Sequence, residues 1–168
     1  NKVQNRFDKD YKPRDEEGIL KRYSDITQVD MSKGNWLVLS SANYFLDDAK
    51  DLCEIQGWYY QFKGRNSIPL KLLMALNNWE AWRKDAQLNH LEIKNIYEYL
   101  GSHVLPGFQK GKTLHSDTKY LMRDCRAEHG LVTDSVWYEA FEGLDNMTET
   151  YIRNMRANGE MINKNPRI

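Results

Sequence analysis

"NWLVLSSANYFLDDAKDLCEIQGWYYQFKG", residues Asn35–Gly64, is the stretch that decides the predicted fold. Its first part, Trp36–Leu39, is a short apolar run bounded by turn residues, which is typical of a buried strand. Its last part, Trp58–Phe62, is brief and aromatic, which also favours a strand. A helical pattern lies between the two runs. The stretch therefore predicts a strand, a helix and a second strand, with a right-handed crossover where the two strands are parallel.

The helix of this stretch has recognisable ends. Asn43 is placed to act as its N-cap, because asparagine side chains accept hydrogen bonds from the first free backbone N–H groups. Apolar side chains then recur with helical spacing at Phe45, Ala49, Leu52 and Cys53. Gly57 suits the position after the last turn, where the backbone often adopts a left-handed conformation.

The rest of the chain favours helices. Residues 1–18 are charged and are expected to form an extended lead-in, and Ile19–Ile26 is expected to form a short strand. Apolar stripes and end signals predict helices over residues 67–83, 92–100, 117–128, 134–144 and 147–158. The predicted fold class is thus α/β: a small, largely parallel sheet with helices in residues 1–100, followed by an all-helical subdomain in residues 101–168.

Composition limits the classes of function. Of the 168 residues, 40% are apolar, which is enough for a buried core. The chain has 24 lysine and arginine residues together and 24 aspartate and glutamate residues together, so the net charge is zero. Domains that bind polyanions generally tend to have an isoelectric point above about 9. The composition therefore argues against a general polyanion binder and leaves a local basic face open.

The cysteines and the hydropathy pattern indicate the cellular setting. Cys53 and Cys125 lie far apart and form no CxxC motif. No apolar run approaches the roughly 18 residues of a membrane span. We therefore expect a reduced, cytoplasmic setting without a membrane partner. The polar opening without Met and the ending at Ile168 lead us to expect a piece of a longer polypeptide.

One Gly/Lys cluster suggests a phosphate loop. Such a loop needs Gly-x-x-x-x-Gly-Lys-Ser/Thr, so that backbone amides and a lysine surround phosphates. Gly107–Thr113 ends in Gly-Lys-Thr, but Gly107 stands one residue too close to Gly111 and no apolar strand precedes it. A flexible basic connector explains this segment better.

A zinc site is the second chemical alternative. Cys125 and His129 are four residues apart, and His115 precedes them. A structural zinc ion usually needs four such ligands, and the sequence offers no evident fourth. A buried cysteine and surface histidines explain these residues better.

Paired carboxylates are the third alternative. Asp47, Asp51 and Glu54 recur with helical spacing and would share one side of the helix that follows Asn43. A nuclease could use such acids to bind magnesium. The solvated outer face of an amphipathic helix is the commoner origin of this pattern.

Basic side chains recur in the second half of the chain. Lys119, Arg123 and Arg126 have helical spacing, and Lys110 and Lys112 precede them. These five are the predicted DNA-binding residues, because Lys and Arg bind backbone phosphates as point charges or as paired donors. Acids are interleaved with them, so an ordinary solvated face remains an alternative.

Three words of the sequence add a family resemblance: WLVLSSANYFL, GWYYQFKGRNSIPLKLLMALNNW and IKNIYEYLG. They resemble the second RecA-like lobe of UvrD/Rep-type superfamily-one DNA helicases, especially forms encoded by bacteriophages. In that family a strand ends in an Arg-Thr-Asn-like turn, before a helix and a Gly-aromatic-x-aromatic word. Asn43 matches the asparagine of this motif, whereas Ser41 and Ala42 stand where arginine and threonine are usual. The resemblance covers residues 16–100 well and 101–168 in outline.

The resemblance implies a fragment of an ATP-dependent DNA helicase or translocase, made of part of a RecA-like motor lobe and its inserted helical subdomain. The family's phosphate loop, acidic magnesium motif and arginine-bearing motif have no counterpart in this sequence. The resemblance therefore implies ATP and magnesium for the parent protein, and neither a cofactor nor catalytic residues in this chain. The implied partners are DNA and the remaining motor domains of the parent chain.

Two other classes stay open. A standalone protein–protein or nucleic-acid-binding adaptor could use Trp58, Tyr59 and Trp137 as exposed anchors. A metal-dependent nuclease could use the acids on the helix after Asn43.

Overall fold

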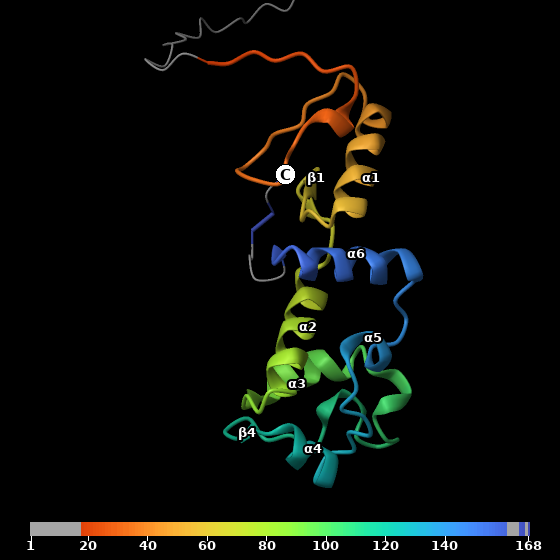
Figure 1. Ribbon diagram of the computed structural model, residues 1–168. Coiled ribbons are helices and arrows are strands. Elements are labelled where there is room, and N and C mark those ends of the chain that lie inside the picture. Colours follow the sequence, from red (N-terminus) through yellow and green to blue (C-terminus); the bar gives the residue numbers. More distant parts are fainter. Residues whose placement is uncertain (1–17, 161–164, 167) are drawn as a thin grey trace, which may run out of the picture.

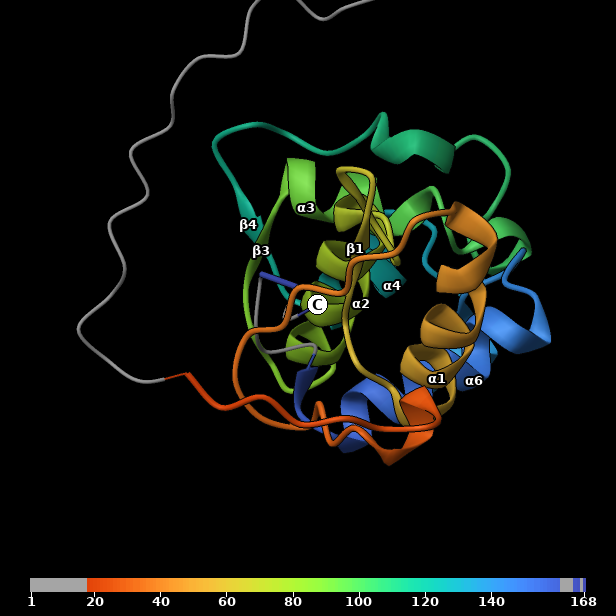
Figure 2. The same ribbon diagram turned by 90° about the horizontal axis from the view of Figure 1, so that it is seen from above.

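The computed structural model describes residues 18–160, 165, 166 and 168 (Figure 1; Figure 2 is the view from above). Its α-helices are α1 (Asp47–Gln56), α2 (Leu70–Trp82), α3 (His90–Tyr97), α4 (Met122–Glu128), α5 (Trp137–Ala140) and α6 (Asn146–Ala157). Its strands are β1 (Gln61–Phe62), β2 (Arg65–Asn66), β3 (Leu88–Asn89) and β4 (Lys119–Tyr120). Short 3-10 helices are η1 (Ile26–Gln28), η2 (Asn43–Leu46), η3 (Gly101–His103) and η4 (Gln109–Gly111).

The prediction of an α/β fold with a largely parallel, RecA-like sheet is wrong for the described residues. β1 pairs with β2 and β3 pairs with β4, and both pairs are antiparallel. Lys63 and Gly64 both have positive φ, +50° and +76°. This conformation lets a two-residue turn send the chain straight back. The aromatic run after Gly57 therefore pairs with the residues just beyond it and needs no crossover.

Two further runs that were expected to be strands have no strand structure. Trp36–Leu39 is irregular, and Leu37 and Leu39 are each 80% exposed. Ile19–Ile26 is also without strand structure. A short apolar run becomes a strand only where a neighbouring strand binds its backbone N–H and C=O groups. Among the described residues no strand pairs with either run.

The ends of the helices follow their capping residues. α3 begins two residues earlier than predicted, because the Asn89 side chain accepts hydrogen bonds from the Leu91 and Glu92 N–H groups. Asn43 does not act as an N-cap: Ala42 occupies the cap position of η2, which has no side-chain capping bond. Asp145 caps α6, because its carboxylate accepts a hydrogen bond from the Thr148 N–H at 2.7 Å.

The other helix predictions are confirmed in part. Leu72, Leu76 and Trp79, the predicted stripe of α2, are buried. The predicted helix over residues 117–128 is shorter, because its first residues pair as β4 with β3. Only α5 forms within residues 134–144. In the described part of the chain, no helix combines the length and the apolar composition needed to cross a membrane.

The tryptophans of α2 organise the core. Trp79 is fully buried and Trp82 is 1% exposed. The Trp79 indole N–H donates to the Ser135 carbonyl oxygen at 3.1 Å, and the Trp82 indole N–H donates to the Tyr120 carbonyl oxygen at 3.0 Å. These bonds satisfy donors that would otherwise be buried without a partner. One cluster of buried side chains extends from Met31 to Met155 and includes residues on both sides of residue 100.

Helix α6 packs against the end of α1, and in Figure 1 it runs crosswise beneath that end. Gly57 ends α1 in the left-handed conformation, with φ of +69°, as predicted. A Cβ atom at Gly57 would lie only 2.3 Å from the backbone of Asn154 in α6. The Asn154 side chain donates to the Ile55 carbonyl oxygen at 3.0 Å, and the Tyr151 hydroxyl donates to the Trp58 carbonyl oxygen at 2.8 Å. Glycine is therefore required at this contact for both its φ and its lack of a side chain.

Gly57→Ala is expected to destabilise the fold much more than Gly64→Ala. Both positions have positive φ, so alanine costs roughly 1 kcal/mol of backbone strain at each. At Gly57 the new Cβ also meets the backbone of Asn154, whereas at Gly64 no heavy atom lies within 4 Å. We expect urea unfolding to show a loss of roughly 1 kcal/mol for G64A and more than about 3 kcal/mol for G57A. Equal losses would contradict the close contact of α1 with α6.

Candidate functional site

Three arginines line one pocket of about 480 Å³, which we call the arginine pocket. Arg83 directly follows α2, and Arg123 and Arg126 lie on α4. The pocket is also lined by Trp82, Asp85, Met122 and Asp134. Cationic side chains from segments far apart in the sequence therefore meet at one place.

The position of the arginine pocket follows from how α2 ends. The bond from Trp82 to the Tyr120 carbonyl holds β4 against the last turn of α2. Helix α4 begins directly after β4 and Leu121, where the Leu121 N–H donates to the Asp124 carboxylate at 2.9 Å. Because α4 starts at this point, Arg123 and Arg126 lie next to Arg83.

The three arginines differ in how far they are already engaged. Arg126 forms an ion pair with the Asp134 carboxylate. Arg83 donates from Nε to the Asp134 carbonyl oxygen at 2.9 Å, and its Nη1 lies 3.3 Å from Glu80 Oε2. Arg123 has a 78% exposed side chain, and its ion pair with Asp124 spans 3.9 Å. Arg123 is therefore the least engaged of the three and the most available to a ligand.

The arginine pocket is suited to an anion that carries several oxygens. Its lining includes three guanidinium groups and two carboxylates, Asp85 and Asp134. Two more carboxylates, Glu80 and Asp124, pair with Arg83 and Arg123 from outside the lining. A guanidinium group is a planar donor of paired N–H groups and matches two oxygens of a phosphate or carboxylate.

The structure brings together two of the five predicted DNA-binding residues, Arg123 and Arg126. Lys119 is exposed on β4, opposite Asn89 of β3, and does not line the arginine pocket. Lys110 and Lys112 are exposed at η4, which packs against α3. Arg83 is not among the predicted binding residues, although it is a basic residue at the predicted end of a helix. Its proximity to α4 depends on a long-range contact that local patterns do not contain.

Gly107–Thr113 does not form a phosphate loop. A phosphate loop opens an α-helix at its Gly-Lys-Thr end, whereas η4 here is a short 3-10 helix in which Lys110 has φ of +64°. The Thr113 hydroxyl forms a hydrogen bond with His129 Nδ1 at 2.9 Å. The segment is a connector that Thr113 ties to the end of α4.

The zinc hypothesis finds no support in the geometry. Cys125 is fully buried, and burial raises the pKa of its thiol to about 12, which disfavours the thiolate that binds zinc. His129 is buried and bound to Thr113. Over residues 18–160, 165, 166 and 168, no group of three or more His, Cys, Asp or Glu side chains could hold a metal ion.

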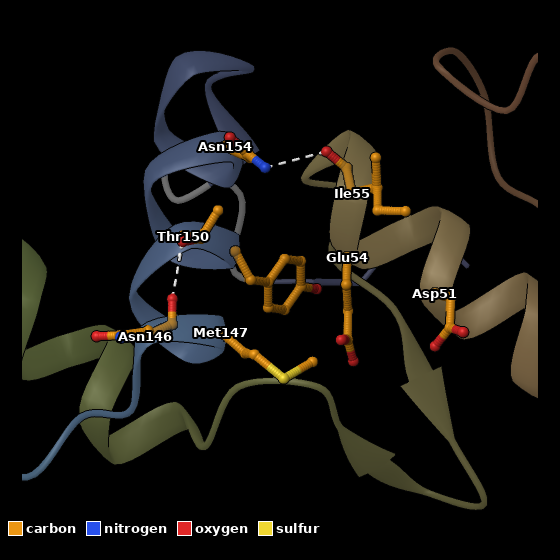
Figure 3. A pocket seen from close by; sticks show the side chains of 8 residues that line it. Asp51, Glu54, Ile55, Asn146, Met147, Thr150 and Asn154 are labelled. Carbon is orange, nitrogen blue, oxygen red and sulfur yellow. Dashed lines mark hydrogen bonds between the residues drawn. The ribbon is translucent and has the colours of Figure 1, made fainter.

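The acidic residues of α1 do not gather as the nuclease hypothesis requires. Asp47 forms an ion pair with Lys50. Asp51 and Glu54 instead line a groove of about 600 Å³ between α1 and α6, together with side chains such as Ile55, Met147, Tyr151 and Asn154 (Figure 3). We call this the α1–α6 groove. Among the described residues no third His, Cys, Asp or Glu joins these two carboxylates, so the cluster of three acids in this hypothesis does not form.

The aromatic residues proposed as exposed anchors of an adaptor are buried. Trp58 is 8% exposed, Tyr59 is fully buried and Trp137 is 4% exposed. The Tyr59 hydroxyl donates to the Ile68 carbonyl oxygen at 3.4 Å, within the core. These residues stabilise the fold and are not available as interface anchors.

Both cysteines are expected to be unreactive in the folded protein. Burial raises the pKa of Cys53 and of Cys125 to about 12, so each thiolate is scarce near pH 8. Ellman's reagent should label both thiols in urea and neither on the same timescale without urea. Rapid labelling of the folded chain would show that one cysteine is more accessible than its burial indicates.

Comparison of the chain with protein-family models, with curated proteins and with solved structures finds no match. The resemblance to helicases is therefore supported only by the words of the sequence in which it was seen. The arginine pocket is the arrangement from which a function is best inferred, because it unites predicted binding residues with a defined cavity.

Proposed function

We propose that this chain binds the sugar–phosphate backbone of DNA at the arginine pocket. The observation that most supports this is the convergence of Arg83, Arg123 and Arg126, of which Arg123 is largely exposed and weakly paired. Paired N–H donors of a guanidinium group match two phosphate oxygens, and such charge-assisted hydrogen bonds are among the stronger ones in proteins. Contacts of this kind position a protein on nucleic acid without reading the bases.

The affinity expected from the arginine pocket is modest and depends on salt. The chain has no net charge, so little long-range attraction adds to the local contacts. About one to three phosphates can be neutralised by three partly paired arginines. The logarithm of the binding constant should then fall with the logarithm of the salt concentration with a slope of about −1 to −3.

The resemblance of the sequence extends this proposal to a parent protein. We propose that the arginine pocket belongs to an ATP-driven DNA helicase or translocase. Other segments of that parent protein bind ATP and magnesium and form the remaining motor domains. The words around Asn43 are the support for this extension. Binding of the DNA backbone is an activity that such a motor requires.

Arg123→Gln is expected to weaken DNA binding roughly five- to tenfold, because it removes the guanidinium group that is least engaged with protein carboxylates. The measurement is fluorescence anisotropy with a labelled single-stranded oligonucleotide at low salt. Arg123 is preferred to Arg126, whose loss would leave Asp134 without its ion pair.

Lys33→Gln is the matched control, because it removes one positive charge from an exposed side chain outside the arginine pocket. Binding that is unchanged in R123Q, or lowered equally in K33Q, would contradict the proposed site. The predicted contacts with the DNA backbone also include three lysines outside the pocket, Lys110, Lys112 and Lys119. A variant with glutamine at all three positions tests them separately from the pocket.

ATP turnover by this chain is expected to stay at background, because Gly107–Thr113 lacks the loop that surrounds phosphates. A phosphate-release assay with and without DNA measures it, and Lys112→Ala should leave the signal unchanged. Clear hydrolysis that disappears in K112A would restore the phosphate-loop hypothesis.

A further inference from the structure

The α1–α6 groove is held open by bonds between its two walls. The Asn154 side chain of α6 donates to the Ile55 carbonyl oxygen of α1 at 3.0 Å, as the dashed line in Figure 3 marks. Tyr151, which is buried beneath the groove, donates to the Trp58 carbonyl oxygen and lies 2.7 Å from the Ser67 hydroxyl. The two helices therefore keep their spacing without a ligand.

Two carboxylates make the α1–α6 groove negative. Asp51 and Glu54 are three residues apart and lie on the same side of α1. One oxygen of Glu54 accepts a hydrogen bond from the Tyr60 hydroxyl at 2.8 Å, which orients the carboxylate. Burial raises the pKa of Tyr60, so this hydroxyl remains a donor. No lysine, arginine or histidine lines the groove to balance the two charges.

Apolar side chains stand at the edges of the same groove. Ile55 of α1 is 69% exposed and Met147 of α6 is 76% exposed. In Figure 3 the Met147 side chain extends from α6 toward the carboxylate of Glu54. An occupant that covers both edges removes two large apolar side chains from water. Flexible methionine is well suited to such a contact, because it adapts to partners of different shape.

We propose that the α1–α6 groove binds a segment of a partner protein that presents a lysine or arginine next to a large aliphatic side chain. The cation pairs with Asp51 and Glu54, and the aliphatic side chain packs between Ile55 and Met147. Charge complementarity selects this occupant, because the groove has two carboxylates and no cation among its lining residues. The proposal concerns a site other than the arginine pocket and does not rest on DNA binding.

Other occupants fit the groove less well. For a metal ion, no third His, Cys, Asp or Glu joins the two carboxylates in the described part of the chain. A free polyamine would pair with the carboxylates and leave Ile55 and Met147 in water. A second copy of this chain would have to present a basic and aliphatic patch of its own.

The test is a titration of ¹⁵N-labelled protein with three short peptides, followed by NMR. One peptide contains a leucine next to a lysine, the second replaces the lysine by glutamine, and the third replaces the leucine by serine. We expect shifts centred on α1 and α6 with the first peptide, at a dissociation constant of about 0.1–1 mM. The other two peptides should bind roughly tenfold more weakly, because each lacks one half of the contact.

The double variant Asp51→Asn with Glu54→Gln should weaken binding of the first peptide roughly tenfold, because the amides keep the shape of the side chains and remove their charge. Asp117→Asn with Glu128→Gln is the matched control, because it removes the same charge from exposed side chains outside the groove. Met147→Thr tests the apolar edge and is expected to fold normally, because Met147 is 76% exposed.

Three results would overturn the proposal. Equal binding by the groove variant and by the control would show nonspecific attraction to the surface. Binding of spermidine as tight as that of the first peptide would assign the groove to small amines. Self-association in sedimentation velocity that disappears in the groove variant would assign the groove to a second copy of this chain.

Discussion

The hydrogen bond from the Trp82 indole to the Tyr120 carbonyl is the constraint on which the arginine pocket depends. It joins residues that lie 38 positions apart, and both side chains are buried. A buried indole N–H without a partner costs about 1–3 kcal/mol, so separation of β4 from the end of α2 is strongly disfavoured. The antiparallel pairing of Leu88 in β3 with Tyr120 in β4 adds to the same constraint. The arginines of α4, which begins directly after β4 and Leu121, take their position from this junction.

Helices could be predicted from the sequence where an apolar stripe and a local cap agree. The stripe of α2 and the glycine that ends α1 are both correct, because side chains within a few residues determine them. The strands could not be predicted in the same way. Whether an apolar run pairs depends on what lies beside it, and a turn at Lys63–Gly64 was enough to replace a parallel crossover by a hairpin.

The candidate site, too, could be predicted from the sequence only in part. The helical spacing of Arg123 and Arg126 was visible in the sequence, and the structure places both in one pocket. The contribution of Arg83 was not visible, because it requires the contact between α2 and β4. For the acids of α1 the local pattern was correct and the surroundings were not. Asp51 and Glu54 do share one side of a helix, but the facing wall from α6 supplies amide and apolar groups and no further carboxylate.

The absence of a side chain at Gly57 has a kinetic consequence for the α1–α6 groove. Because the end of α1 already touches the backbone of Asn154, the walls of the groove are in contact at one end and cannot move closer there. The groove is therefore preorganised, and a partner that enters it orders few groups of this protein. The association rate is then set by diffusional encounter, and partners of high and low affinity differ mainly in their dissociation rates.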